Sequence, residues 1–237
     1  MSTSDPDRQS TIRQRPSVTI SYAQTLDGRL AAANGSSQWI SGPAALHFTH
    51  ALRAAHDAIM VGVGTVVQDN PRLTVRLVEG RDPLRVVVDS RLRIPLDAAV
   101  LANGAARGTL LATTARADEE RVAAISAIGA DVVMLPATPS GHVELAALLD
   151  HLASQGVASV MAEGGAGIIT SLLRERLADR LAVTVAPKIL GRGIDAIGDL
   201  GIASLAAALQ LHDVTTTAYG VDLVIDGQIV YVDEGAT

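Results

Sequence analysis

The chain contains no cysteine among its 237 residues. This absence excludes disulfide bonds, thiol nucleophiles and zinc sites built from thiolates. Aromatic residues are also scarce, with one Trp, one Phe and three Tyr, although 48% of the residues are hydrophobic. The apolar residues are therefore mostly Ala, Val, Leu and Ile, which is typical of Ala–Leu helices packed on Val–Ile strands.

An excess of positive charge and a long apolar run are missing as well. The formal charge is −6, so we do not expect the basic surface of a nucleic-acid-binding protein. No apolar run approaches the roughly 20 residues that span a bilayer, so we expect no membrane partner. Residues 1–15 are polar and lack the apolar segment of a signal peptide. They predict a disordered tail on a cytoplasmic protein, followed by one domain over residues 16–237.

Strand and helix patterns alternate along that domain. Strands are predicted at 17–23, 57–61, 84–90, 108–114, 131–135, 158–165 and 181–190. Helices are predicted from Ser41, as a cap before Pro43, to 56, and at 64–69, 118–129, 143–154 and 166–176. The end of the chain predicts antiparallel strands at 209–217, 221–226 and 228–232, the last two joined by a turn at Asp226-Gly227. This order predicts an α/β domain with a mixed sheet covered on both faces.

Glycines and polar residues follow several of the predicted strands. The stretches are Gly62-Val63-Gly64-Thr65, Asp89-Ser90, Thr113-Thr114 and Glu163-Gly164-Gly165. Ligands of open α/β sheets bind beyond the carboxyl ends of the strands, and a glycine turn that opens a helix offers free N–H groups to phosphate. A single such turn can be an ordinary strand–helix connection. Two glycine turns with two hydroxyl-ended strands predict a nucleotide or dinucleotide site.

Charged residues suggest partners for an anionic ligand. Candidates are Arg53, Arg72, Arg76 and Arg91, because the forked donors of arginine match phosphate oxygens. Arg72 and Arg76 are four residues apart around an expected Leu-Thr-Val strand, which would place both on one face. The carboxylates of Asp27, Asp69 and Glu163 stand beside predicted turns, where each could bind a ligand, donate a proton or cap the turn.

Two histidines and the single tryptophan are open to more than one interpretation. His47 and His50 are three residues apart on a predicted helix with no third ligand, so we expect helix-surface histidines and no metal. Trp39 could lie in the core or stack on the aromatic ring of a ligand.

Six ordered segments together resemble the pyrimidine reductase family of riboflavin biosynthesis. This family includes the reductase domain of a bifunctional bacterial enzyme and stand-alone archaeal and fungal reductases. The resemblance runs from about residue 17 to the end of the chain. The segments are TLDGRLA (25–31), SQWIS (37–41), LRAAHDAIMVGVGTVVQDNPRLTVR (52–76), PLRVVVDSRLRIPL (83–96), EGGAGIITSLL (163–173) and VAPKILG (185–191).

The resemblance implies a dihydrofolate-reductase-like three-layer α/β/α fold with a mixed, mostly parallel sheet. It also implies NADPH as cofactor and a homodimer. The implied substrate is a phosphoribosylamino-pyrimidine, in its diaminopyrimidinone or aminouracil form. Its glycosylamine opens to an imine, and a hydride from NADPH reduces the anomeric carbon to give the ribitylamino 5′-phosphate. Such chemistry requires no metal; the protein orients the two ligands and excludes water.

Site residues follow from the same resemblance, although it identifies no catalytic proton donor. The residues implied to bind substrate are Ser37, Arg53, Leu73, Arg76 and Glu163. Those implied to bind NADPH are Ala23, Trp39, Thr65, Asp69, Ser90, Gly164, Gly165, Ala166 and Gly167, with the pyrophosphate at the helix that follows Gly165 and the adenosine end near Ser90.

Two features depart from the bifunctional bacterial pattern, and the first, together with MVGVGTV (60–66) and NPRLTV (70–75), favours the stand-alone archaeal type. Ser21 aligns with a lysine that the bifunctional members carry in their first strand. The chain also lacks the cysteines that a zinc deaminase domain needs, so we expect any deamination to be done by another protein.

Two alternative functions are also compatible with the sequence. One is an NADPH reductase of the same fold with another substrate, such as a dihydropterin, because fold does not determine function. The other is a non-catalytic nucleotide-binding protein. The presence of Arg53, Arg76 and Glu163 favours the phosphorylated pyrimidine, since a substrate without phosphate would not need the arginines.

Overall fold

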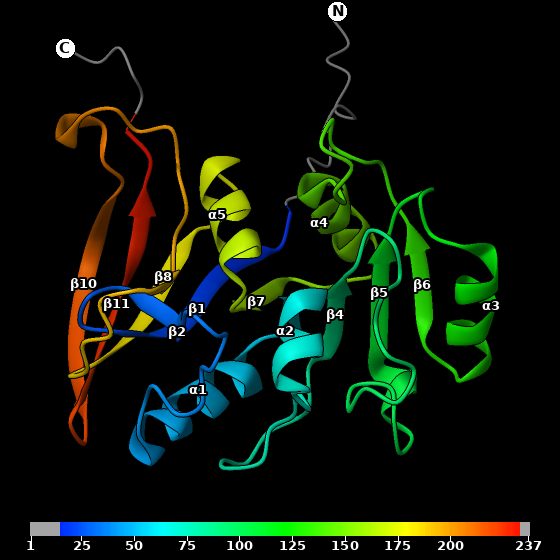
Figure 1. Ribbon diagram of the computed structural model, residues 1–237, viewed down its shortest axis with the longest axis horizontal. Helices are drawn as coiled ribbons and strands as arrows, with labels where there is room; N and C mark the ends of the chain where they lie inside the picture. Colours follow the sequence, from blue (N-terminus) through cyan, green and yellow to red (C-terminus); the bar gives the residue numbers. More distant parts are fainter. Residues whose placement is uncertain (1–14, 233–237) are drawn as a thin grey trace, which may run out of the picture.

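A nine-stranded sheet forms the centre of the molecule in the computed structural model, which describes residues 15–232 (Figure 1). The strands of this sheet are β1 (Ser17–Thr25), β3 (Ala58–Gly62), β4 (Leu84–Val88), β5 (Thr109–Thr113), β6 (Asp131–Met134), β7 (Ser159–Glu163), β8 (Arg180–Ala186), β10 (Gln210–Tyr219) and β11 (Asp222–Val230). A separate two-stranded sheet pairs β2 (Arg29–Ala32) with β9 (Gly193–Asp195). The helices are α1 (Pro43–Ala55), α2 (Val63–Asp69), α3 (Glu119–Ala127), α4 (Leu145–Ser154) and α5 (Ala166–Arg174), with short 3₁₀ segments at Ala105–Gly108 and Leu205–Ala207.

The order across the main sheet is β10-β11-β8-β1-β7-β3-β4-β5-β6. Every neighbouring pair from β8 to β6 is parallel, whereas β11 is antiparallel to both β8 and β10. The prediction of a mixed, mostly parallel sheet is therefore confirmed. Because the parallel strands end at one edge, β1, β3, β4 and β7 deliver their last residues to the same side of the molecule.

Alternating side chains of the central strands enter two separate cores. On β3, Ala58 and Met60 pack with residues of α4 and α5. Ile59 and Val61 point to the opposite face and pack with Val66 of α2 and with residues of α3. Both faces of the sheet are thus covered, which accounts for the unbroken apolar runs of its strands. The predicted three-layer arrangement is confirmed.

The turn predicted at Asp226-Gly227 is wrong. Both residues lie inside the continuous strand β11, and the hairpin turn falls at Gly220, which has φ +67°. The carboxylate of Asp226 accepts two hydrogen bonds from Arg180 on β8, at 2.6 and 2.7 Å. A Cβ on Gly227 would lie 2.9 Å from the carbonyl oxygen of His212, so glycine allows close strand approach at this position.

Three local predictions also differ from the structure. The segment from Arg72 to Arg76 is irregular instead of a strand, and Leu73 has φ +54°. Ser41 does not cap α1: the cap is Gly42, whose N–H donates to the Asp222 carboxylate at 2.6 Å. The strand expected to reach residue 190 ends at Ala186.

Most of the predicted N-terminal tail, residues 1–14, lies outside the described residues. Arg15 is described, and its guanidinium donates to both carboxylate oxygens of Asp179, at 2.7 and 2.8 Å. None of the helices between residues 15 and 232 has the length and apolar character needed to cross a membrane.

Candidate active site

A cavity of about 1030 Å³ lies at the carboxyl ends of β1, β3, β4 and β7. Its volume is at the upper end of the range for small-molecule sites, so it has room for two ligands. All fourteen site residues suggested by the family resemblance line it: Ala23, Ser37, Trp39, Arg53, Thr65, Asp69, Leu73, Arg76, Ser90, Glu163, Gly164, Gly165, Ala166 and Gly167. The structure brings these residues together, and their individual roles stay predictions.

A glycine turn forms one wall of the cavity. Gly164 and Gly165 have φ of +78° and +85°, a backbone region that favours glycine. A Cβ on Gly165 would lie 3.2 Å from the Thr65 hydroxyl oxygen on α2, so the turn passes close to that helix. Directly after it, the first N–H groups of α5 lack partners within the helix, and no side chain caps them. This wall can hold an anion such as a pyrophosphate on backbone donors.

The loop after β4 forms a second part of the wall. The buried Asp89 carboxylate organises this loop by accepting hydrogen bonds from the Ile94 N–H at 2.8 Å and the Arg93 Nε at 3.5 Å. The Ser90 carbonyl accepts from the Thr114 hydroxyl at 2.9 Å. Arg93 lines the cavity, whereas the predicted anion partner Arg91 does not. Arg93, and not Arg91, is therefore the arginine of this loop that borders the cavity.

Arg53 and Glu163 form a bidentate ion pair inside the cavity. Nε of Arg53 is 2.9 Å from one carboxylate oxygen and its NH2 group is 2.5 Å from the other. The NH1 group donates to the Thr74 carbonyl at 3.1 Å. Arg53 therefore connects α1, the end of β7 and the irregular segment before Arg76, and its donors are largely committed within the protein.

Arg76 is the more open cation at this end of the cavity. Its NH1 group contacts the carbonyl and hydroxyl of Thr74, and its side chain is otherwise exposed. Although Arg76 is exposed overall, partial desolvation beside the cavity lowers its pKa, and the nearby positive charges of Arg53 and Arg72 lower it further. Arg72 also lines the cavity and makes no ion pair with any residue of the described part of the chain. This crowding of cations is favourable for a bound anion.

His50 is not the surface residue that the sequence suggested, because only 3% of it is exposed. Its Nδ1 accepts the Arg76 backbone N–H at 2.9 Å, and it lines the cavity. Desolvation lowers its pKa to about 4, with further contributions from the charges of Arg53, Arg76 and His47. His47 is exposed, as predicted. Within residues 15–232, no three His, Asp or Glu side chains are grouped to hold a metal ion.

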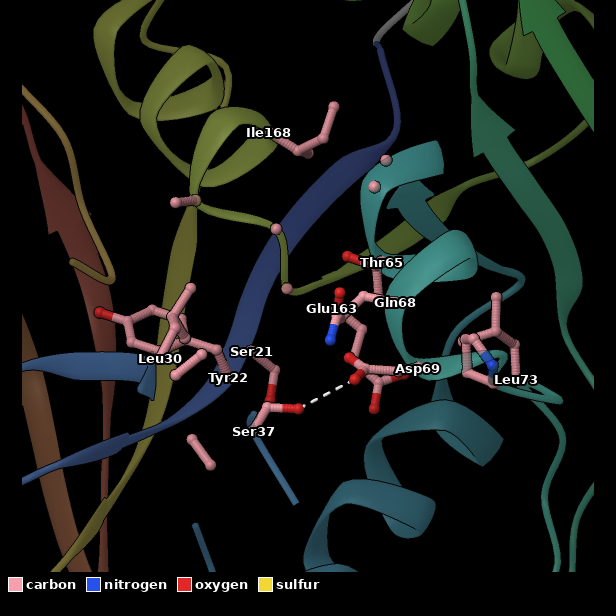
Figure 2. A pocket seen from close by; sticks show the side chains of 18 of the residues that line it. Ser21, Tyr22, Leu30, Ser37, Thr65, Gln68, Asp69, Leu73, Glu163 and Ile168 are labelled. Atoms are coloured by element: carbon pink, nitrogen blue, oxygen red, sulfur yellow. Dashed lines mark hydrogen bonds between the residues drawn. The ribbon is translucent and has the colours of Figure 1, made fainter. Parts of the chain in front are cut away.

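The loop from Ser37 to Ser41 lines another part of the cavity. Figure 2 shows the Ser37 hydroxyl pointing to Asp69, to which it donates a hydrogen bond of 3.0 Å. Trp39 is 67% exposed, which rules out the core position considered from the sequence. The Nζ of Lys188, the single lysine of the chain, donates to the carbonyls of Trp39 and Ile40, at 2.7 and 2.8 Å.

Asp27, by contrast, has a local role. It does not line the cavity, and its carboxylate accepts from the Thr25 hydroxyl at 2.6 Å and the Gly191 N–H at 2.6 Å. The Thr25 hydrogen bond, followed by those from Gly191 and Leu190, lowers its pKa to about 2. Asp27 therefore caps a turn and ties it to the segment after β8.

Several residues of the cavity wall were not predicted from the sequence to contact a ligand. They include Ser21, Tyr22, Leu30, Gln68 and Ile168, all labelled in Figure 2, and also Leu46, Thr49, His50, Arg93 and His142. A signal for part of this set is present in the sequence. Leu46, Thr49, His50 and Arg53 follow one another at spacings of three, one and three on α1 and so share one face of the helix. If Arg53 is assigned to a site, this spacing predicts that His50 faces the same site.

Comparison with known proteins gives the family of the chain. The family model described as RibD C-terminal domain matches residues 16–225, and the chain belongs to this family. It is 38% identical over 214 residues to the riboflavin biosynthesis protein RibD of Aquifex aeolicus, covering 90% of this chain and 58% of that protein. It is 40% identical over 218 residues to the 2,5-diamino-6-ribosylamino-4(3H)-pyrimidinone 5′-phosphate reductase of Methanothermobacter thermautotrophicus, covering 90% and 97%.

Solved structures give the same result for the fold. RibD from Acinetobacter baumannii superposes with a TM-score of 0.77 at 27% identity, over 91% of this chain and 58% of that one. Dihydrofolate reductase from Enterococcus faecalis gives a TM-score of 0.53 at 11% identity, over 92% and 97%, and this match concerns the fold alone. The predicted family and the dihydrofolate-reductase-like fold are confirmed. The chain spans just over half the length of the RibD proteins that it matches.

Proposed function

We propose that this protein is an NADPH-dependent reductase that converts a phosphoribosylamino-pyrimidine into its ribitylamino 5′-phosphate in riboflavin biosynthesis. The observation that carries the proposal is the composition of one cavity. It has a glycine turn with free helix N–H groups on one wall and a cluster of arginines, with Glu163, at another. Both the stand-alone reductase and the RibD relatives, which align along 90% of this chain, support that substrate class.

The residues present fit a dinucleotide cofactor. Gly164 and Gly165 leave space for a pyrophosphate above α5, where any side chain at Gly165 would meet Thr65. Ser90 and Arg93 lie on the loop after β4, where they would hold the adenosine end, with Arg93 beside the ribose phosphate that distinguishes NADPH from NADH. When bound, NADPH would supply the hydride for the reduction.

The substrate lies, in this proposal, at the arginine end. Arg76 and Arg72 bind its phosphate, and the Ser37 hydroxyl and Leu73 contact the rest of the molecule. Arg53 keeps the Glu163 carboxylate in place through the bidentate pair, so that it can accept hydrogen bonds from the substrate. The chain thereby orients the two ligands and excludes water between them.

An assay with purified protein tests the proposal. NADPH oxidation would be followed with the aminated and the deaminated phosphoribosylamino-pyrimidine, and the product identified by mass spectrometry. We expect oxidation with at least one form and little with the dephosphorylated compounds. Oxidation that requires a dihydropterin instead would favour the alternative substrate, and NADPH binding without turnover would favour the non-catalytic alternative.

The homodimer implied by the resemblance is part of the proposal. Its support is β10, the outer strand of the sheet, in which consecutive residues are exposed. Apolar Val214 on this strand and Val221 in the hairpin turn that follows it are also exposed. Light scattering on the purified protein would give the mass of a dimer if this is correct, and that of a single chain if it is not.

A further inference from the structure

His50 occupies a position in the cavity that no role above explains. It lies on α1 one turn before Arg53, it is 97% buried, and it contacts the segment that carries Arg76. A buried histidine in an anion-binding region can be a proton carrier, a charged partner or a neutral donor. The hydrogen bonds around its ring distinguish these possibilities.

The tautomer of His50 follows from its contact with Arg76. A backbone N–H can only donate, so the Nδ1 that receives it at 2.9 Å carries no hydrogen. Burial and the neighbouring arginines keep the ring neutral, with a pKa of about 4. The hydrogen of the neutral ring must therefore be on Nε2, which becomes a fixed N–H donor.

The open direction of Nε2 follows from the burial of the ring. Nε2 has no hydrogen-bond partner within residues 15–232. In the described part of the chain, the polar side-chain atoms that are both fully buried and without a partner are Nε of Arg29 and the Thr113 hydroxyl. Because Nε2 of His50 has no partner and does not belong to this set, it is not fully buried. Some of the small exposed area of His50 therefore belongs to Nε2, and the space that His50 borders is the cavity.

We propose that the Nε2–H of His50 is a binding donor for the phosphate of the substrate, acting beside Arg76 and Arg72. The inference rests on the proposed function, since it assigns one more contact to the same substrate. A neutral donor suits this position because a fourth cation next to Arg53, Arg72 and Arg76 would add repulsion when the site is empty. The Nδ1 bond also ties the donor to the Arg76 backbone, so the two groups approach the phosphate in a set geometry.

Two substitutions separate the two ring nitrogens. His50→Asn keeps an acceptor near the position of Nδ1, and hence the bond to the Arg76 N–H, but removes the donor at Nε2. His50→Gln places a donor near Nε2 and gives up the acceptor at Nδ1. Calorimetry with ribose 5-phosphate measures the sugar-phosphate affinity, and fluorescence titration of Trp39 with NADPH reports whether the rest of the site is intact.

We expect His50→Asn to weaken ribose 5-phosphate binding about tenfold, the value of one hydrogen bond to a charged group. His50→Gln should weaken it less, and NADPH affinity should stay within about twofold in both variants. Wild-type affinity in His50→Asn would overturn the inference and leave a structural role for the ring. Failure of the wild type to bind ribose 5-phosphate, with NADPH still bound, would instead overturn the proposed substrate end and this role with it.

A spectroscopic measurement tests the tautomer without relying on variant stability. Long-range ¹H–¹⁵N spectra of the full chain show which nitrogen of each histidine carries hydrogen, and the signal missing in His50→Gln identifies His50. We expect hydrogen on Nε2 at neutral pH and a shift of that signal when ribose 5-phosphate is added. Hydrogen on Nδ1, or no response to the ligand, would contradict the proposal.

Discussion

Arg53 and Glu163 are 110 residues apart in the sequence and face each other as a bidentate ion pair, with N–O distances of 2.9 and 2.5 Å. The side chains are 10% and 18% exposed, so the pair is largely shielded from water. The family resemblance implied that each residue binds substrate independently of the other. Their pairing means that a substitution at Arg53 acts first through Glu163 and only then on a ligand.

Arg53→Ala is expected to destabilise the protein by about 3 kcal/mol, because it leaves a shielded carboxylate without its partner. Arg53→Ala/Glu163→Ala should recover part of that loss, since no unpaired charge remains. Urea unfolding of the two variants and the wild type measures both changes. Equal loss in the single and the double variant would contradict the importance of the unpaired carboxylate.

The glycine turn gives a prediction for cofactor affinity. Gly165→Ala would bring a Cβ within 3.2 Å of the Thr65 hydroxyl at φ +85° and should weaken NADPH binding at least tenfold, or roughly 1.4 kcal/mol. Gly156→Ala is a matched control, because Gly156 has φ +82° with nothing within 4 Å and lies outside the cavity. Both variants should lose roughly 1 kcal/mol of stability from the left-handed backbone, but only the first should lose affinity. Fluorescence titration with NADPH and thermal unfolding distinguish the two effects.

Arg93 gives a prediction for cofactor choice. The wild type should prefer NADPH to NADH, and Arg93→Ala should reduce that preference about tenfold through loss of one charge-assisted contact. Arg91→Ala removes the same charge two residues away, outside the cavity, and should change the preference little. Dissociation constants for both cofactors with the three proteins are the measurement. If Arg91→Ala changed the preference and Arg93→Ala did not, the assignment of Arg93 to the ribose phosphate of NADPH would be wrong.

Loss of either open arginine should reduce turnover of the phosphorylated substrate. Arg76→Ala and Arg72→Ala are each expected to lower kcat/KM about ten- to a hundredfold, while NADPH affinity barely changes. The variants should also discriminate less between phosphorylated and dephosphorylated substrate than the wild type does. If the variants discriminated between the two substrates as strongly as the wild type does, the proposal that Arg72 and Arg76 bind the substrate phosphate would be wrong.

His50 predicts how stability depends on pH. Its folded pKa of about 4 is below the ordinary value of 6.5, so the unfolded chain binds more protons between these values. The free energy of unfolding should therefore be fully retained above pH 6.5 and fall as the pH drops towards 4, by up to roughly 3 kcal/mol. His50→Gln should flatten this part of the curve, and His47→Gln, at an exposed position, should not. Urea unfolding at several pH values provides the comparison.

Much of the fold and of the site could be predicted from the sequence because the signals are local. Apolar runs such as 58–61 and 84–88 mark buried parallel strands, and the glycines Gly62 and Gly164-Gly165 mark the edge of the sheet at which the cavity lies. Within one strand–turn–helix unit, the backbone geometry follows from the residues of that unit. The ordered segments of the family resemblance then assigned fourteen residues to one site, and one cavity contains all of them.

Long-range contacts decided the rest. Asp226-Gly227 has the composition of a turn, but β8 supplies Arg180 to its carboxylate and keeps it in a strand. His50 has the spacing of a surface histidine pair, but the segment that carries Arg76 folds over it and buries it. A propensity is a small energy that partners from distant parts of the chain can exceed, and those partners are known only when the chain has folded.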